Sequence, residues 1–577
     1  MSDSTPVSRT GLLDRIERIG NRLPDPTMLF IGGTLIIMVV SAIAVSLGWS
    51  VERVTMQAIT NADGSAGTQL VGTGVFVEPF SLLSRDGLDW VFSNMVKNFV
   101  EFDPLGIVLT GMLGIGVAER TGLLAALLKA FMAIVPAKLL TPAMVFLGIM
   151  SSMGLDAGYI VLPPLAAMLY IAVGRSPLAG IAAVFAGVSA GFNANLLVTG
   201  LDPMLSGLST EGAQLLDENY AVAPTCNWYF MIASTFIMTL AGWWVSSALV
   251  EPRLRSKPAD DGGPVPEGDR DPKAHLLNDD DRRGLRAAGI AGVIVVGALL
   301  ALVLIPGAPL YTAHAPDPAS IGENARMITV EIVPNGMALE EAERPAGAFV
   351  HNDQLVVPST RRFDRWVDAI VPMIFLSFLI PGLAFGAATG SVKSSKDAAE
   401  HMIEAMKAMA PIIVLAFFAG QFIALFNQSN LGTMLAIWGG SQLANMGLSA
   451  GLLMVAFVLV TMVFNLFVGS MSAKYALFAP IFVPMFMMIG ISPELTQAAY
   501  RIGDSVTNVI TPLNAYLVII LVFMQKHAPK SGLGTLVAMM LPYSIVFLIA
   551  WTILLLMWLW LGIPLGPAGP LSYSVGG

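Results

Sequence analysis

Ala157-Gly-Tyr-Ile-Val-Leu-Pro-Pro164 is followed by Gly174-Arg-Ser-Pro177 and then by Gly187-Val-Ser189. The pattern returns 316 residues later as Ala473-Lys-Tyr-Ala-Leu-Phe-Ala-Pro480, Gly490-Ile-Ser-Pro493 and Gly503-Asp-Ser505. Ala, Tyr, Pro, Gly and Ser stand in register in the two copies without a gap. Both copies lie in apolar sequence interrupted by Gly, Pro, Ser and Asn. Paired, interrupted apolar segments in two halves of a chain are typical of a binding site inside a membrane protein.

The composition around the repeats indicates a polytopic membrane protein. Of the 577 residues, 55% are hydrophobic and only 12% are charged, and the mean hydropathy is +0.72. Soluble domains carry about 25% charged residues. The net charge of −9 sits in loops and gives no reason to expect nucleic acid. The single cysteine, Cys226, has no partner for an internal disulfide.

The first apolar run, Met28 to Leu47, is preceded by Arg9, Arg15, Arg18 and Arg22. Twenty apolar residues are enough to cross a bilayer, and flanking arginines place their end of the chain in the cytoplasm. No small-residue cleavage site closes the run convincingly, so it is not interpreted as a signal peptide. The sequence predicts a multi-pass protein of the bacterial inner membrane with a cytoplasmic N-terminus.

The rest of the chain alternates between apolar runs and charged loops. We expect an all-α fold with about nine spanning helices and two re-entrant hairpins, built as inverted repeats with broken helices. Prolines 136, 142, 163, 164 and 177 are expected to divide residues 104–200 into short pieces, and Leu88 to Phe102 has the spacing of an interfacial helix. The predicted segments are a cytoplasmic N-terminus (1–27), a first membrane half (28–249), a cytoplasmic loop (250–286), a spanning helix (287–305), an external insert with some strand (306–360), a second membrane half (361–562) and an external tail (563–577).

Each repeat contains a polar tip and a broken helix. The tips are Ser151-Ser152-Met-Gly154-Leu-Asp156 and Asn465 to Ser472, and the breaks are Gly191-Phe-Asn193-Ala-Asn195 and Thr507-Asn508-Val-Ile-Thr511-Pro512. Asn and Thr oxygens with freed carbonyls suit Na⁺, and exposed helix N-termini favour an anionic group. For one tip or one break, close helix packing or a simple kink explains the residues equally well. The symmetry of the two copies favours a site.

Charged residues inside apolar sequence are the sharpest candidates. Arg501 and Asp504 lie three residues apart on one helix face, Asp202 follows the first break, and Lys474 follows the second tip. Burying an ionisable group in a membrane is costly, so such residues are functional candidates. Arg501 could clamp a carboxylate, and Asp202 and Asp504 could take a proton or bind a cation. The structural alternative is an Arg501–Asp504 pair that only neutralises itself.

Three motifs resemble those of the AbgT family of p-aminobenzoyl-glutamate transporters over nearly the whole chain. They are Gly191-Phe-Asn-Ala-Asn-Leu-Leu through Asp202-Pro, Asn465 through Phe486, and Arg501-Ile-Gly-Asp504-Ser through Thr511-Pro512. The resemblance implies a bowl-shaped homodimer that takes up p-aminobenzoyl-glutamate or exports sulfonamide antimetabolites. Tyr475 stands where the family typically has Trp. By motif position the family's functional residues fall on Asp202, Asn465, Ser472, Pro493, Arg501, Asp504 and Pro512.

We therefore predict a secondary carrier for p-aminobenzoyl-glutamate-like anions that is coupled to Na⁺ or H⁺. Its partners would be an aromatic carboxylate substrate, lipid and a second copy of the chain, with no cofactor other than Na⁺ as a possible coupling ion. The predicted substrate-binding residues are Ser152, Asn195, Ser472, Tyr475, Pro493, Arg501 and Pro512. The predicted ion-coupling residues are Asn193, Asp202, Asn465, Asp504, Asn508 and Thr511, with Asn465 and Asn508 as Na⁺ ligands.

The sequence favours a carrier over several other classes of function. The sequence contains neither GxxxxGK[ST] nor HExxH, which disfavours ATP-driven transport and a zinc enzyme. A proton-driven exporter of sulfonamide antimetabolites remains an alternative to uptake. An intramembrane aspartyl protease using Asp156 and Asp202 would leave Arg501 and the second repeat unexplained. A channel would need a ring or filter of repeated ligands.

Overall fold

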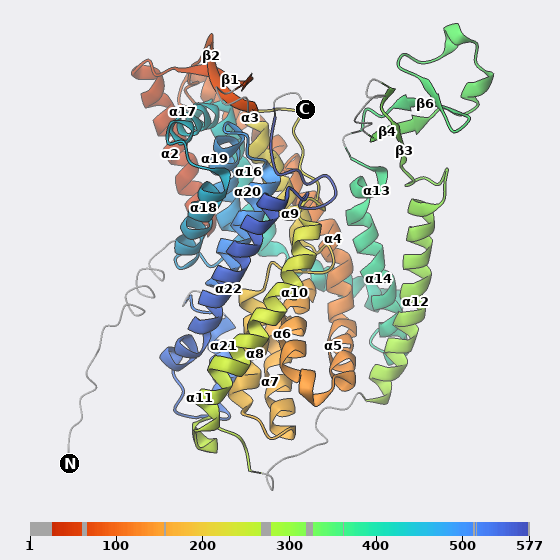
Figure 1. Cartoon of the computed structure of the whole chain (residues 1–577), viewed down its shortest axis with the longest axis vertical. Helices are drawn as coiled ribbons and strands as arrows, with labels where there is room; N and C mark the ends of the chain where they lie inside the picture. The colour runs from red at the N-terminus through yellow and green to blue at the C-terminus, as the bar shows by residue number, and fades with distance from the viewer. Residues whose placement is uncertain are drawn as a thin grey trace.

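The protein is described by a computed structural model that covers residues 26–60, 66–154, 157–266, 278–318, 327–361, 363–511, 514 and 516–574. The fold is mostly helical (Figure 1). The helices of the N-terminal half are α2 (Pro26–Ser46), α3 (Arg85–Val100), α4 (Asp103–Arg120), α5 (Leu123–Ile134), α6 (Leu140–Met150), α7 (Ala157–Ala172), α8 (Pro177–Phe185), α9 (Leu201–Gln214), α10 (Trp228–Val245) and α11 (Glu251–Arg255). The later helices are α12 (Asp279–Leu304), α13 (Arg365–Asp368), α14 (Ile370–Thr389), α15 (Ser395–Ala408), α16 (Ala410–Gln428), α17 (Leu431–Asn445), α18 (Ala450–Asn465), α19 (Met471–Met487), α20 (Pro493–Val506), α21 (Tyr516–Gln525) and α22 (Leu533–Leu561).

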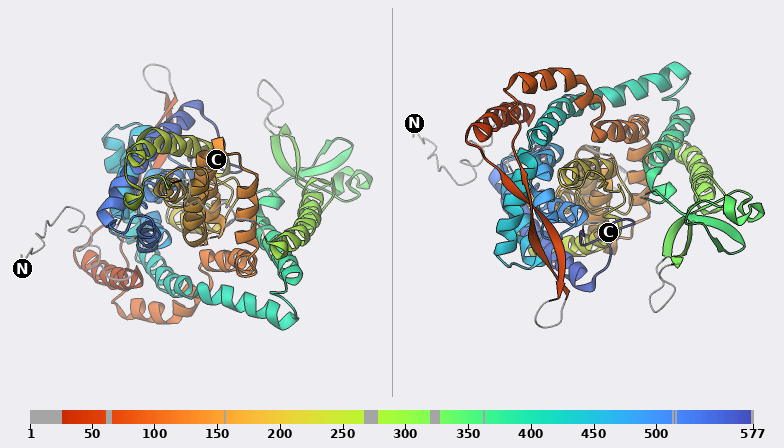
Figure 2. Two further views of the ribbon diagram at one scale, coloured as in Figure 1. Left: turned by 90° about the horizontal axis from the view of Figure 1, so that it is seen from below. Right: turned by 90° about the horizontal axis from the view of Figure 1, so that it is seen from above.

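Two small antiparallel sheets are added to the helices. One has the order β3 (Ala313–Pro316), β4 (Met327–Ile332), β6 (Gln354–Pro358) and β5 (Phe349–His351), and it lies in the insert where strands were expected. The other pairs β1 (Val51–Thr60) with β2 (Ala66–Val77). Figure 2 (right) shows this second ribbon crossing over one end of the molecule. The expectation of a purely helical membrane half was wrong here, because the alternating Val, Thr, Gly and Gln of residues 51–77 suit a two-stranded ribbon.

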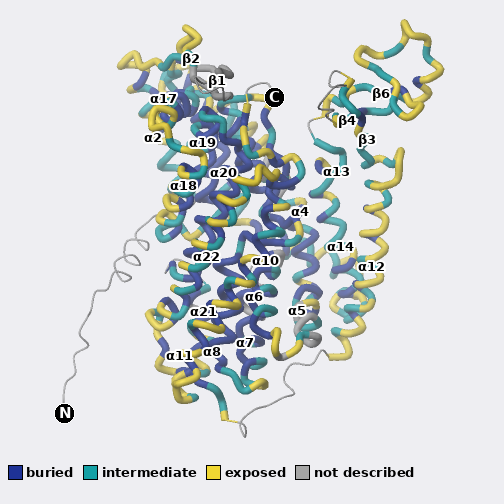
Figure 3. Tube along the Cα trace, in the orientation of Figure 1, coloured by how far each residue is buried: buried dark blue, intermediate teal, exposed yellow. Residues whose placement is uncertain are grey.

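Six of the described helices are long and apolar enough to cross a membrane: α2, the continuous helix over Trp228–Arg255, α12, α14, α16 and α22. The helix α12 shows the lipid-facing character most clearly, because only 11% of its most apolar window is buried (Figure 3). Ile290, Val293 and Ile294 on its surface are 65–75% exposed. Such a surface is stable only against lipid or another protein. The chain is a multi-pass membrane protein.

The repeated Gly-x-Ser-Pro motif marks the same helix-to-helix turn twice. Gly174 and Gly490 follow α7 and α19 with φ of +74° and +82°, a conformation that glycine adopts without strain. Ser176 and Ser492 then cap α8 and α20, accepting hydrogen bonds from the backbone N–H of the third residue onward at 3.3 and 3.1 Å. Pro177 and Pro493 are the first helical residues. The sequence repeat is therefore a structural repeat.

The third part of the motif is a close helix crossing. A Cβ atom at Gly187 would lie 2.2 Å from the carbonyl oxygen of Val145 in α6. A Cβ atom at Gly503 would lie 2.5 Å from the carbonyl oxygen of Val458 in α18. Only glycine allows the backbones to approach so closely. In the first copy α6, α7 and α8 thus correspond to α18, α19 and α20 in the second.

Proline breaks the helices less often than expected. Pro163 and Pro164 lie inside α7, which continues through them, so the prediction of a break there was wrong. In a tightly packed membrane protein, neighbouring groups satisfy the backbone atoms that a proline frees. Pro142 is in the first turn of α6, and Pro177 begins α8, where proline costs little.

Both repeats end in a broken helix near the middle of the fold. The helix α8 passes into a π-helical turn over Ala186–Ala190, and regular structure then stops until α9 begins at Leu201. The helix α20 ends at Val506, and α21 begins at Tyr516. Contacts place α9 against α4, α19 and α20. The first broken segment and α20 therefore meet in the core, while α12, α14 and the insert stand to one side (Figures 1 and 2).

Candidate functional site

The centre of the candidate site is an ion pair between the two repeats. The Nη2 atom of Arg501 in α20 donates to the Oδ1 atom of Asp202 in the first turn of α9 at 2.6 Å. The other oxygen of Asp202 accepts from the backbone N–H and the hydroxyl of Thr199, at 2.6 and 2.9 Å. The Arg501 and Asp202 side chains are only 2% and 9% exposed. A buried pair of this kind is weak evidence for stability alone, which makes a functional role worth considering.

A second buried pair lies three residues farther along α20. The Nζ atom of Lys474 in α19 lies 2.7 Å from the Oδ1 atom of Asp504, and both side chains are 1% exposed. The structural alternative supposed that Arg501 pairs with Asp504, and this prediction was wrong. Each has its own partner on a different helix, because residues three apart on α20 diverge enough to face α9 and α19 separately.

Asn193 in the first break joins the two pairs. Its Nδ2 atom donates to the Ser505 hydroxyl at 2.8 Å and to the Asp504 Oδ2 atom and the Arg501 carbonyl oxygen at 3.2 Å each. The Oδ1 atom of Asn193 is buried and has no hydrogen-bond partner within the part of the chain that the structure describes. The break in repeat one therefore closes directly on the helix of repeat two.

Asn465 organises the second break. Its Nδ2 atom donates to the Asp504 carbonyl oxygen at 2.6 Å and to Thr507 Oγ1 and Asn508 Oδ1 at 2.8 Å each. Its Oδ1 atom accepts from the ammonium of Lys474. Both side-chain oxygens of the predicted Na⁺ ligands, Asn465 and Asn508, are therefore already engaged. Thr511 lies beside this group and donates to the Leu466 carbonyl oxygen at 3.3 Å.

Tyr475 is fully buried and lies at one end of a series of side-chain hydrogen bonds that was not predicted from the sequence. Its hydroxyl lies 2.6 Å from Ser209 Oγ in α9, and Ser209 donates to Gln497 Oε1 in α20 at 2.8 Å. The spacing could have revealed it, because Gln497 is one turn before Arg501 and Ser209 is two turns after Asp202. Glu494 extends the same face of α20 and accepts from the Tyr220 hydroxyl at 3.0 and 3.1 Å.

Some predicted substrate residues make contacts outside the central pairs. Asn195 donates to Ser152 Oγ at 2.7 Å, which ties the first tip to the first break. Pro493 is the first residue of α20, about 12 Å along the helix axis from Arg501 at 1.5 Å per residue. Pro512 lies outside the described residues. Ser152, Asn195 and Pro493 therefore take no part in the two ion pairs, which are made by Arg501 with Asp202 and by Lys474 with Asp504.

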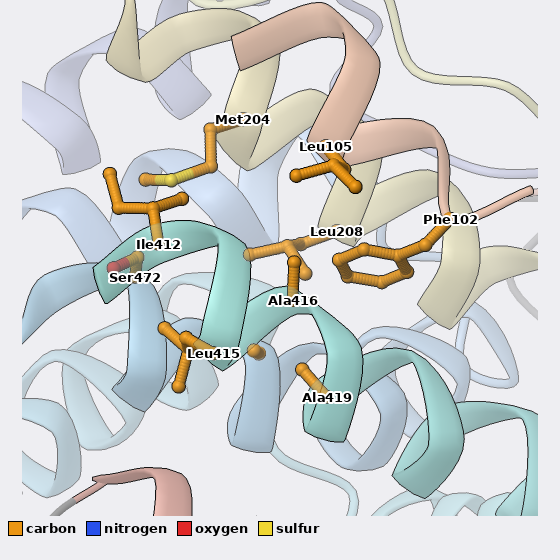
Figure 4. Close-up of a pocket in the computed structure, with 10 residues that line it drawn as sticks. Phe102, Leu105, Met204, Leu208, Ile412, Leu415, Ala416, Ala419 and Ser472 are labelled. Carbon is orange, nitrogen blue, oxygen red and sulfur yellow. The ribbon is translucent and has the colours of Figure 1, made fainter. Parts of the chain in front are cut away.

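Two adjoining cavities lie beside the start of α9. The larger, of about 170 Å³, is lined by Phe192, Gly200, Leu201, Met204, Met471 and Ser472, among others. The smaller, of about 30 Å³, shares Met204, Ile412 and Ser472 and reaches Phe102 and Leu208 (Figure 4). Ser472 lines both. Gly200 and Leu201 place the larger cavity next to Asp202, whereas Arg501 and Tyr475 do not line either one.

The cavities are small for a drug-sized ligand. Sites for such ligands usually enclose about 300–1,000 Å³, and one water accounts for about 30 Å³. The larger cavity therefore holds a few waters in this conformation. Residues of α16 and α19 face α9 across these cavities, and a ligand of that size needs more room than either cavity offers in this conformation.

Two buried hydrogen-bond donors on α20 have no acceptor among the described residues. They are the Nε atom of Arg501 and the Nε2 atom of Gln497. The two residues are four apart on α20 and so lie on one face. Buried donors without acceptors are uncommon and costly. Their shared requirement is an oxygen acceptor.

Comparisons with known proteins agree with this architecture. The sequence model described as the "AbgT putative transporter family" matches residues 11–328 and 345–573. The p-aminobenzoyl-glutamate transport protein of Escherichia coli (strain K12) is 35% identical over 568 residues, which is 98% of each chain.

Two solved transporters have similar structures. The Alcanivorax borkumensis YdaH transporter superposes with a TM-score of 0.77 at 36% identity, covering 94% of this chain and all of that one. Neisseria gonorrhoeae MtrF, described among antimetabolite efflux pumps, gives 0.79 at 35% identity, covering 97% of this chain and all of that one. With the family model matching almost the whole length, the chain belongs to the AbgT family of transporters.

Proposed function

We propose that this protein is a secondary active transporter of p-aminobenzoyl-glutamate-like aromatic amino-acid conjugates, driven by a gradient of H⁺ or Na⁺. The observation that carries the proposal is the buried Arg501–Asp202 pair beside a cavity between the two repeats. The similarity to the Escherichia coli transport protein supports the substrate class. A guanidinium, small polar donors and an apolar wall suit a molecule with carboxylates and a ring.

The ion pair suggests how substrate binding is coupled to a proton. Arg501 is already held by Asp202, so a substrate carboxylate that binds the guanidinium takes over the place of the Asp202 carboxylate. In this proposal the carboxylate released from Arg501 takes up a proton. The proton then balances the charge of the one substrate carboxylate that binds Arg501. Na⁺ coupling through Asn465 and Asn508 is the alternative driving reaction.

The two buried donors on α20 that lack an acceptor among the described residues suggest a further contact with the substrate. A substrate carboxylate next to Arg501 Nε would also reach Gln497 Nε2, while the chain from Tyr475 through Ser209 holds the Gln497 carbonyl oxygen in place. Gln497 would thus act as a substrate-binding residue. It is not among the residues that the resemblance to the AbgT family implies.

Gln497→Leu is expected to raise KM for the anion about tenfold and to change the maximal rate little. Loss of one hydrogen bond to a charged group costs about 1.5–3 kcal/mol, which is roughly 10- to 100-fold. The measurement is concentration-dependent uptake into proteoliposomes. Gln421→Leu is the matched control, because Gln421 is also buried but bonds Asn98 and the Met95 carbonyl oxygen away from the site. Equal KM values for the two variants would remove Gln497 from the site.

Asn465→Ala and Asn508→Ala are expected to weaken the dependence of transport on the driving ion. Asn465 contacts Lys474 and the Asp504 backbone, and it holds Asn508 at the break, so either change loosens the coupling residues. Uptake is measured with Na⁺ and pH gradients imposed separately. If both variants kept the wild-type dependence on Na⁺ and on pH, these residues would have no part in coupling.

The proposed membrane arrangement has about nine spanning helices and two re-entrant hairpins, α6–α7 and α18–α19. With 11 and 16 residues, α6 and α18 are short for a crossing that needs about 20. We propose that the N-terminus and the 250–286 loop face the cytoplasm, that the 306–360 insert and the tail after residue 562 face outward, and that two copies form a homodimer. Cysteine-accessibility labelling at the insert and the loop tests the orientation.

Export of sulfonamide antimetabolites is the second candidate function. The similarity to MtrF, which is described among antimetabolite efflux pumps, favours it, and the same site would serve either direction because the gradients decide. Flux assays with labelled p-aminobenzoyl-glutamate and a labelled sulfonamide separate the two substrates. Counterflow in proteoliposomes tests the carrier mechanism itself, since a carrier exchanges labelled for unlabelled substrate, a channel gives uncoupled current, and a protease gives neither.

A further inference from the structure

Three oxygen atoms surround the ammonium of Lys474 in the core. They are Asp504 Oδ1 at 2.7 Å, Asn465 Oδ1, and the Val468 carbonyl oxygen at 3.4 Å. They come from three different elements: α20, the end of α18, and the loop before α19. We call this group the oxygen cradle. One carboxylate, one amide oxygen and one backbone carbonyl form the kind of ligand set that sequence analysis assigned to Na⁺.

The cavity beside Lys474 offers its ammonium no polar alternative to the oxygen cradle. Lys474 lines this cavity of about 450 Å³, and the other nine lining residues are all apolar, including Leu29 and Phe30 in α2. Moving a charged amine from the cradle into such surroundings would leave it without hydrogen-bond acceptors. The fold therefore keeps the ammonium among the three oxygens.

We infer that Lys474 is a tethered cation that fills the oxygen cradle, so that this transporter does not bind Na⁺ there. A Na⁺ ion bound by the same oxygens would lie about 4 Å from the ammonium. At an effective dielectric constant of about 20, repulsion between two unit charges at that distance weakens binding by roughly three orders of magnitude. With the cradle occupied, the proposed carrier is expected to be coupled to protons, and that last step alone rests on the proposed function.

The inference is tested by Na⁺ binding in the absence of substrate. The unfolding temperature of purified protein in detergent is measured as choline chloride is replaced by NaCl at constant ionic strength, because a ligand that binds only the folded state raises it. The wild type is expected to show no saturable shift. In Lys474→Met the unfolding temperature is expected to rise with NaCl and to saturate in the millimolar range. The rise should be smaller with Li⁺ or K⁺.

Two controls make the result specific. In Lys129→Met the lost lysine also has an ion-pair partner, Asp281 at 3.2 Å, but lies outside the cradle, so no Na⁺ effect should appear. In Lys474→Met/Asp504→Asn the carboxylate is gone, so the gained Na⁺ effect should disappear again. All titrations are done at one fixed pH of about 8.

A saturable Na⁺ shift in the wild type would overturn the inference, as would a Lys474→Met protein that folds and shows none. If Lys474→Met fails to fold, the same Na⁺ titration is done with Lys474→Gln and with the wild type. Transport gives a second measurement: wild-type uptake should change less than twofold when Na⁺ is replaced by choline. A protein that moves no p-aminobenzoyl-glutamate would refute the proposed function and leave the binding test unaffected.

Discussion

Arg501→Ala is expected to lower transport at least 100-fold in counterflow assays, while the remaining folded protein keeps its oligomeric state in size-exclusion chromatography. The substitution removes the guanidinium that would hold the substrate carboxylate. It also leaves Asp202 buried beside apolar residues without its cation. Breaking a buried pair in this way costs about 3–5 kcal/mol, so the variant should unfold at a lower temperature than the wild type. Arg501→Lys should recover little transport, because an ammonium lacks the planar fork.

Two variants separate the functional loss from the loss of stability. Arg501→Gln/Asp202→Asn replaces both charges by amides and should regain stability without regaining transport. Arg175→Ala breaks a comparable bridge, from Arg175 Nη2 and Nε to Glu251 at 2.6 and 2.8 Å, far along the chain from α20. It should lose stability and keep transport per folded molecule. Normal transport by Arg501→Ala would take Arg501 out of the mechanism.

Asp202→Asn is expected to abolish accumulation driven by a pH gradient and to preserve exchange. In the proposed cycle the substrate carboxylate displaces Asp202 from Arg501, and the displaced group binds the proton. An asparagine is displaced without taking a proton, so substrate binding should become independent of pH and tighten several-fold. Accumulation in proteoliposomes with an imposed pH gradient should fall at least tenfold, whereas counterflow should stay within a few-fold of wild type.

The matched control for Asp202 is Asp217→Asn. Asp217 also accepts a side-chain hydrogen bond, from the Tyr573 hydroxyl at 3.2 Å, but it is not the ion-pair partner of Arg501. This variant should retain both accumulation and exchange. If Asp202→Asn still accumulated substrate against a gradient under a pH difference, Asp202 would not be the proton-binding group.

Much of the fold could be predicted from local patterns. Long apolar runs predicted α2, α12, α14, α16 and α22, because the length needed to cross a bilayer is set by geometry. The Gly-x-Ser-Pro motif predicted equivalent turns, since left-handed glycine, serine capping and N-terminal proline are local effects. The predicted break at Pro163-Pro164 was wrong, because neighbouring groups satisfy the backbone atoms that a proline frees. The all-α prediction missed β1 and β2, although their own residues suit a two-stranded ribbon.

The site could be predicted only as a set of residues. Asp202, Asn193, Asn465, Arg501 and Asp504 stood out because charges and amides in apolar sequence are costly. Gln497 and Ser209 did not stand out, because uncharged polar residues on helices are common and their link to Tyr475 joins three helices.

The sequence by itself determined the membrane class, the two-fold repeat and the residue types of the site, because hydropathy, turn chemistry and the cost of burying charge all act within short stretches of chain. Only the tertiary structure decided the partners. Arg501 pairs with Asp202 across 299 residues, and Lys474, not a bound ion, lies among the oxygens of Asp504 and Asn465. Pairing depends on which helix faces meet where two helices cross. Gly187 crosses α6 at Val145 and Gly503 crosses α18 at Val458, so both crossings are fixed by packing between separate helices.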